Sequence, residues 1–169
     1  MKNLPHVKVK IRESDIWEFD PCTPGMKFFE KFLPATISTE PENNIDLACE
    51  LLREYHDPEH AGCYRTPLSN VRWFMAKLVE ALDRQCPYAP YFHDYLTFPD
   101  ARNTVPREWL DADGTYRGNP VSVNDKGELE TGEFITYHDD PCILAQNLAH
   151  IAHLVDLLRR ARKKKKGRS

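Results

Sequence analysis

The sequence lacks the long hydrophobic segments that membrane insertion requires. No apolar run approaches the ~20 residues of a membrane-spanning helix, and the segment from Met1 to His6 has no apolar signal core. Both absences predict a chain without a membrane partner. The five cysteines are an odd number with no paired spacing, which favours reduced thiols and a cytoplasmic location.

Motifs that define common enzyme classes are absent as well. The sequence has no glycine-rich phosphate loop, no G-x-S-x-G nucleophile elbow, no C-x-x-C pair and no EF-hand calcium loop. What is present is 41% hydrophobic and 29% charged residues over 169 positions, which suits one soluble domain with a single core. This composition excludes collagen, a mucin-like stalk and a wholly disordered chain.

Periodic apolar residues predict four helices. Three of them begin at a capping residue followed by proline, which fits the first helical turn because no N–H is needed there: Thr23-Pro24, Thr66-Pro67 and Asp140-Pro141. The fourth helix covers residues 45–55, whose apolar side chains recur at helical spacing and which stop before Pro58.

Shorter patterns predict β-structure. Apolar and charged residues alternate over 7–13 and predict a half-buried strand. The segment around the turn Asn124–Gly127 predicts a hairpin, and residues 134–137 suggest a further strand. Residues 87–119 have no lasting periodicity, and we expect an irregular layer there with one short helical turn at 106–110.

Together these elements predict a mostly helical α+β fold. We expect a single globular domain over residues 1–158, with about four helices, an N-terminal strand and a small hairpin, followed by a basic helical extension over 159–169. The charge is divided in the same way. The extension, RRARKKKKGRS, has eight basic residues and no acid, whereas residues 1–158 carry a net charge of −11.

The last predicted helix has the clearest apolar pattern. Its side chains recur at 4-3-4-3 spacing, as in a coiled-coil seam: Leu144, Leu148, Ile151, Val155 and Leu158. Because the seam spans only about two heptads, docking on the domain's own core and pairing with a second copy or a partner helix both stay open. A homodimer through this helix is therefore one expectation.

The basic extension is the first candidate site. Each Lys or Arg that binds a phosphate releases a condensed counterion, so a run of them favours nucleic acid or nucleoprotein. No Gly or Pro interrupts the helix between Pro141 and Gly167, so it can continue through the run. The alternatives are a frayed tail, a tail bound to the chain's own acidic body, and contact with an acidic protein. The candidate nucleic-acid contacts are Arg159, Arg160, Arg162, Lys163, Lys164, Lys165, Lys166 and Arg168.

Aromatic residues form a second candidate surface, concentrated between positions 73 and 98. Base stacking is disfavoured there because no basic residue lies between Cys86 and Ala101. Core packing and a patch for a protein partner are the two interpretations. The candidate protein contacts are Trp73, Tyr88, Tyr91, Phe92 and Tyr95.

One loop suggests a metal site. His56, His60 and Cys63 follow one another at spacings of 4 and 3, with Cys49 one helix earlier, and zinc accepts four such ligands in a tetrahedron. We expect no cofactor other than a structural zinc at these four residues. A polar surface loop with buried cysteines is the alternative interpretation.

His-Asp dipeptides offer an enzymatic alternative. The order His56, His93-Asp94 and Asp156 resembles that of metal-dependent HD phosphohydrolases, in which such side chains hold metal ions that activate water. In that family the His-Asp pair lies within an apolar helix, whereas here it follows Cys86-Pro87 in the irregular stretch.

The favoured interpretation is a non-enzymatic binding or accessory protein. A regulator, an inhibitor or a small component of an assembly would all fit. In each case the acidic, aromatic body would bind a protein partner, and the basic extension would bind nucleic acid or nucleoprotein. The metal-dependent hydrolase is the competing interpretation.

Overall fold

The chain forms two compact units, and the mostly helical α+β fold expected from the sequence is confirmed. The larger unit combines Met1–Thr97 with Pro141–Ser169, and the smaller is Phe98–Asp140. The computed structural model describes residues 6–54, 66–85, 102–116, 118–135 and 140–167.

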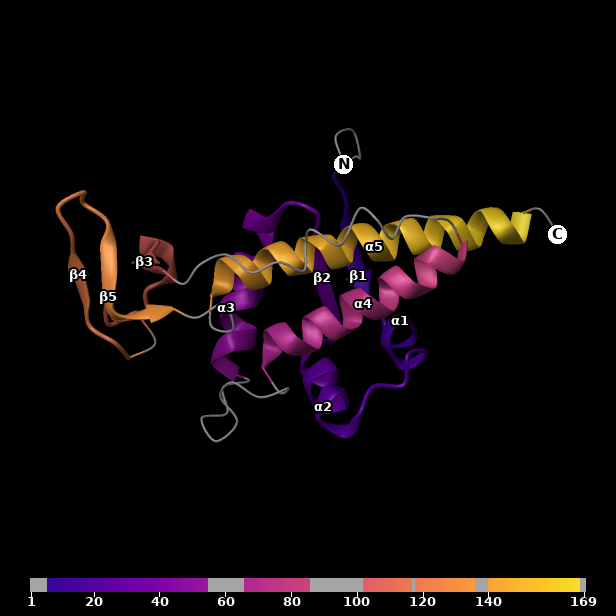
Figure 1. Cartoon of the computed structure of the whole chain (residues 1–169), viewed down its shortest axis with the longest axis horizontal. Coiled ribbons are helices and arrows are strands. Elements are labelled where there is room, and N and C mark those ends of the chain that lie inside the picture. The colour runs from indigo at the N-terminus through magenta and orange to yellow at the C-terminus, as the bar shows by residue number, and fades with distance from the viewer. Residues whose placement is uncertain (1–5, 55–65, 86–101, 117, 136–139, 168–169) are drawn as a thin grey trace. The chain divides into compact units, whose positions relative to one another are not determined.

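One long helix, α5 (Pro141–Gly167), is the centre of the larger unit. It packs against α4 (Pro67–Gln85), against α3 (Ile45–Glu54) and against strand β2 (Ala35–Ser38). Figure 1 shows α4 lying along α5. The predicted seam is buried, with no member more than 4% exposed: Leu144, Leu148, Ile151, Val155 and Leu158. The seam therefore docks on the chain's own core. The homodimer through this helix is not tested and stays a prediction.

The proline-marked helix starts fall close to where the sequence places them. Helix α4 begins at Pro67, and the Thr66 hydroxyl accepts a hydrogen bond from the Ser69 N–H at 3.1 Å, as expected of a capping residue. Helix α2 (Thr23–Phe32) has its proline in the first turn, although the cap position is one residue earlier, at Cys22. Local start signals therefore set these boundaries to within one residue.

The N-terminal strand has an unexpected partner. Strand β1 (Lys8–Ile11) buries Val9 and Ile11, as its alternation predicts, and pairs antiparallel with β2, Ile11 opposite Ala35. Strand β2 could not be predicted from its four neutral residues, because its order comes from pairing with β1. Helix α1 (Glu13–Trp17) was also not predicted; it is a single short helix held by the fully buried Ile16.

A buried asparagine connects the sheet to the helices. The 3-10 helix η1 (Pro41–Asn44) leads into α3 and ends at Asn44, which is 1% exposed. The Asn44 amide donates to the carbonyl oxygens of Ser38 at 2.8 Å and Ala145 at 3.2 Å. Its carbonyl accepts the Ser38 N–H at 2.8 Å. One side chain thus satisfies backbone groups of both β2 and α5.

The smaller unit contains a three-stranded antiparallel sheet in the order β3-β5-β4. Its strands are β3 (Arg102–Val105), β4 (Val121–Val123) and β5 (Leu129–Ile135). The predicted hairpin is confirmed as β4 and β5. The side-chain oxygen of Asn124, Oδ1, closes its turn by accepting the N–H groups of Lys126 and Glu128, both at 2.9 Å. Gly127 supplies the positive φ of 78° that this turn needs.

Two expectations for this region need correction. Strand β3 lies in the stretch predicted to be irregular, because its order comes from pairing with β5 and not from a local pattern. The further strand expected at 134–137 is, as far as Ile135, the end of β5. The short helical turn is confirmed as the 3-10 helix η4 (Arg107–Trp109).

Candidate nucleic-acid interface

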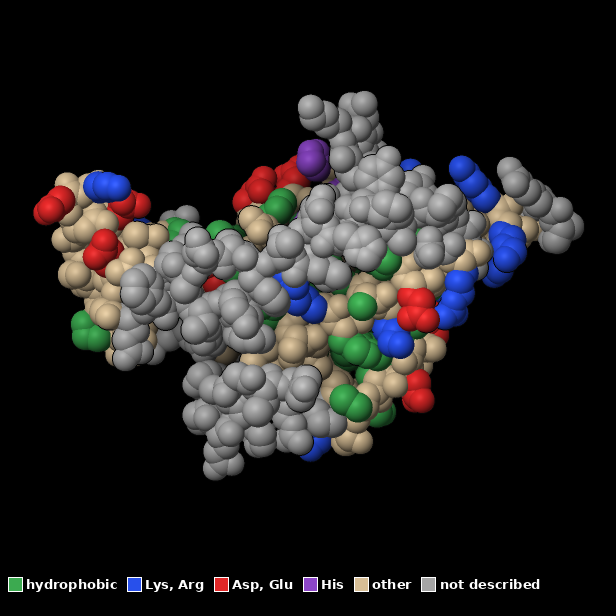
Figure 2. Space-filling model, in the orientation of Figure 1, with side chains coloured by type: hydrophobic (Ala, Val, Ile, Leu, Met, Phe, Trp, Pro, Cys, Tyr) green, Lys and Arg blue, Asp and Glu red, His purple; other side chains and the backbone are tan. Residues whose placement is uncertain are grey.

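Helix α5 continues without a break into the basic run. Among the residues whose burial is described, Leu158 is the last buried one. We call residues 159–167, which remain helical, the helix end. Successive side chains on a helix are about 100° apart, so the basic residues surround the helix axis. Figure 1 shows this segment extending past the end of α4, and Figure 2 shows Lys and Arg side chains gathered along it. Lysines in the last turn also offset the negative end of the helix dipole.

The first residue of the helix end is attached to the N-terminal part of the unit. The Arg159 guanidinium donates to Asp15 Oδ2 at 2.7 Å and to the backbone oxygen of Lys10 at 2.9 Å. The same Asp15 carboxylate accepts the backbone N–H of Arg12 at 2.8 Å, which caps α1. Arg159 therefore connects α5 with both β1 and α1.

A second arginine, about one turn further along α5, is paired with Glu18, the residue directly after α1. Arg162 donates two hydrogen bonds to the Glu18 carboxylate, at 2.9 and 2.8 Å, in the forked geometry that guanidinium groups form with planar anions. These bonds raise the pKa of Arg162 above its already high value. Arg160 pairs within the helix, with Asp156 at 3.1 Å.

The lysine run differs from the arginines. Lys163, Lys164, Lys165 and Lys166 are all exposed. In the described part of the chain, no ion pair involves Lys163, Lys164 or Lys165. Of the eight predicted contacts, three arginines are thus paired with the chain's own acids, and Arg168 lies outside the described residues.

The acids that pair with the helix end were not identified from the sequence. Asp15 and Glu18 are three residues apart on and just after α1, and so are Arg159 and Arg162 on α5. Residues three apart share a helix face, so the two spacings match. That match is the only signal the sequence contains, and it connects residues 144 positions apart.

The aromatic surface is described only in part. Trp73 is half-buried, and its ring packs on Phe29 with centroids 5.8 Å apart, so it contributes to the core. The other candidate protein contacts, Tyr88, Tyr91, Phe92 and Tyr95, lie outside the described residues.

The metal candidates are likewise described in part. Cys49 is half-buried on α3, whereas His56, His60 and Cys63 lie outside the described residues. Of the hydrolase set, Asp156 is described and pairs with Arg160, while His93 and Asp94 are not described. Within the described ranges, no group of three His, Cys, Asp or Glu side chains is arranged to hold a metal ion.

Two histidines of α5 lie in an environment that disfavours their charged form. Burial lowers the pKa of His150 to about 4, and repulsion from the Arg72 guanidinium and from the protonated form of His153 adds to this effect. Burial also lowers the pKa of His153, against the opposing effect of Asp156. Both imidazoles are therefore neutral at pH 7 and add no charge to the helix end.

This environment predicts a pH-dependent contribution of His150 to stability. The unfolded chain takes up a proton near pH 6.5 and the folded chain only near 4, so stability falls as pH falls through that window. After allowance for partial exposure, we expect wild type to lose about 1–2 kcal/mol more than His150→Gln between pH 7 and pH 5. Urea unfolding of both proteins from pH 8 to pH 5 measures this difference; parallel stability curves would contradict it.

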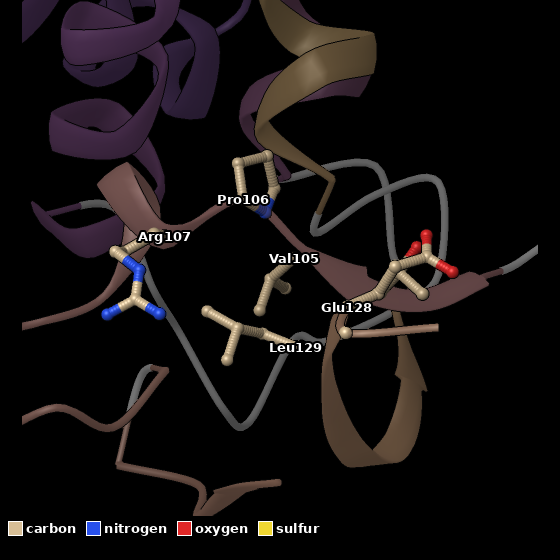
Figure 3. A pocket seen from close by; sticks show the side chains of 7 residues that line it. Val105, Pro106, Arg107, Glu128 and Leu129 are labelled. Carbon is tan, nitrogen blue, oxygen red and sulfur yellow. The ribbon is translucent and has the colours of Figure 1, made fainter. Parts of the chain in front are cut away.

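The smaller unit has an open hollow of about 380 Å³ between the end of β3 and the start of β5. Val105 and Leu129 lie in its middle, and Arg107 and Glu128 lie on opposite sides (Figure 3). A ligand site normally places a few polar groups around one point. These two charged side chains do not converge, so the hollow carries no assignment.

Helix α5 is long and apolar enough to cross a bilayer by length and composition alone. However, 67% of its apolar window is buried inside the structure. Burial of this kind is typical of the central helix of a packed core.

Comparisons with known proteins assign the chain to no family. No protein-family model, no curated protein and no solved structure matches it. The fold and the helix end define a small α+β protein with a cationic surface clustered at one end of its central helix.

Proposed function

We propose that this chain is a non-enzymatic binding or accessory protein that contacts the phosphates of a nucleic acid or nucleoprotein through the end of α5. The observation that carries this proposal is the exposed run Lys163–Lys166 on a helix that is continuous with the core. Because the helix is already formed in the free chain, binding does not require a disordered tail to be ordered first.

The charge distribution supports contact at the periphery of a polyanion. Residues 1–158 have a net charge of −11, which repels phosphates within a Debye length of about 8 Å at physiological salt. The chain is therefore suited to present its helix end to nucleic acid while the acidic body faces another partner. A protein partner at that body belongs to the same proposal. The hydrolase alternative has no supporting observation among the described residues.

Neutralising the lysine run tests the proposal. We expect the variant with Lys163, Lys164, Lys165 and Lys166 all changed to Gln to bind short duplex DNA or single-stranded RNA at least tenfold more weakly than wild type at about 50 mM salt. Fluorescence anisotropy with labelled oligonucleotides measures both affinities.

A matched control separates the site from the overall charge. Changing Lys8, Lys27, Lys31 and Lys126 to Gln removes the same four charges from exposed positions elsewhere in the chain. If the helix end is the binding surface, this control retains most of the affinity. Equal losses of affinity in the two variants would show that only net charge matters. An unchanged affinity in the lysine-run variant would remove the proposal.

A further inference from the structure

The two arginines at the start of the helix end are already bound to groups that resemble phosphate. Both oxygens of the Glu18 carboxylate accept hydrogen bonds from Arg162, at 2.9 and 2.8 Å. A guanidinium binds a phosphate through the same two parallel bonds, so Glu18 occupies the place that a phosphate would take.

Arg159 is less accessible to other anions than Arg162. Its side chain is one-third exposed, and its Nη2 donates both to Asp15, which is 15% exposed, and to the Lys10 carbonyl. The acids are held in position by α1, since Ile16 between them is fully buried and Asp15 also caps the helix. The contact is therefore part of the folded unit.

We propose that Asp15 and Glu18 are intramolecular competitors of nucleic-acid phosphates, which withhold Arg159 and Arg162 and confine phosphate binding to the lysine run. This inference rests on the proposed function. It assigns α1 a role that limits the affinity of the helix end. The Arg162–Glu18 pair is the more exposed of the two, and ion pairs at the surface contribute little to stability, so a polyanion at low salt can compete with it.

Removing the two carboxylate charges tests the inference. We expect Asp15→Asn/Glu18→Gln to bind duplex DNA at least fivefold more tightly than wild type at about 50 mM salt, because two more guanidinium groups reach phosphates. The slope of log K against log salt should steepen by about one to two.

The matched control is Glu13→Gln/Asp20→Asn. It removes two acidic charges from the same segment, at exposed positions that make no contact with Arg159 or Arg162 in the described structure. The inference is supported if Asp15→Asn/Glu18→Gln gains more DNA affinity than Glu13→Gln/Asp20→Asn. Equal gains in affinity would overturn it, because the effect would then be one of overall charge.

A second variant keeps the test independent of folding defects in α1. Adding Arg162→Gln to the Asp15→Asn/Glu18→Gln protein should reverse at least half of the gain, since the released guanidinium is its source. If the full gain in DNA affinity persists, the inference is overturned.

The two proposals can fail separately. If the lysine-run variant loses binding and the two acid pairs gain affinity equally, the proposed function stands and only this inference is removed. If neither wild type nor Asp15→Asn/Glu18→Gln binds, both proposals fail.

Discussion

Phe29→Ala is expected to destabilise the larger unit by about 3–5 kcal/mol, the largest effect of any single substitution proposed for this chain. Phe29 is 1% exposed. Its ring packs against four others, with centroid distances of 5.1 Å to Phe28, 6.3 Å to Phe32, 5.8 Å to Trp73 and 5.8 Å to Phe74. Truncation removes the buried ring surface and leaves a cavity that neighbouring aromatic rings cannot fill by simple rotamer changes.

Chemical denaturation followed by tryptophan fluorescence measures this loss. The control is Met26→Ala on the same helix, where the side chain is 41% exposed and the expected change is within about 0.5 kcal/mol. A loss below about 1 kcal/mol for Phe29→Ala would show that the aromatic cluster is not packed as described.

Asn44→Ala is expected to cost about 2–4 kcal/mol, although the side chain is small and polar. The substitution removes three hydrogen bonds, two to Ser38 and one to Ala145. The buried Ser38 N–H left without its partner costs about 1–3 kcal/mol, and loss of the two bonds that the Asn44 amide donates adds about 0.5 kcal/mol each. This penalty makes the loss larger than that of the more exposed arginine pair at the helix end, Arg162–Glu18, which is worth about 1 kcal/mol or less.

The neighbouring residue provides the control for this prediction. Asn43 is exposed and donates one hydrogen bond to Glu40 at 3.1 Å, so we expect Asn43→Ala to change the free energy of unfolding by less than about 1 kcal/mol. Equal effects at Asn43 and Asn44 in urea unfolding would contradict the role assigned to the buried amide.

The long helices could be predicted because their signals are local. Apolar spacing and a proline in the first turn identify α2, α4 and α5, and alternation identifies β1. Strands β2 and β3 could not be predicted in the same way, since each is ordered by a partner strand distant in sequence and not by a local pattern.

The same distinction applies to the candidate site. The basic run is visible in the sequence because its residues are consecutive, and the absence of Gly and Pro before Gly167 predicts the helix that carries it. The pairing of Arg159 and Arg162 with Asp15 and Glu18 depends on how β1 and α1 lie against α5. Charge segregation along the chain is therefore only partly preserved in the fold: Arg159 and Arg162 pair with acids of the body, whereas the lysine run stays exposed.

The most direct test of the central claim is the salt dependence of nucleic-acid binding by the intact chain. If Lys163–Lys166 bind phosphates, log K for duplex DNA should fall with log salt at a slope of about −3 to −4, since each phosphate contact contributes about −0.9. The slope should approach zero in the variant with all four lysines changed to Gln. Equal slopes in the two proteins would contradict the claim that the end of α5 is the binding surface.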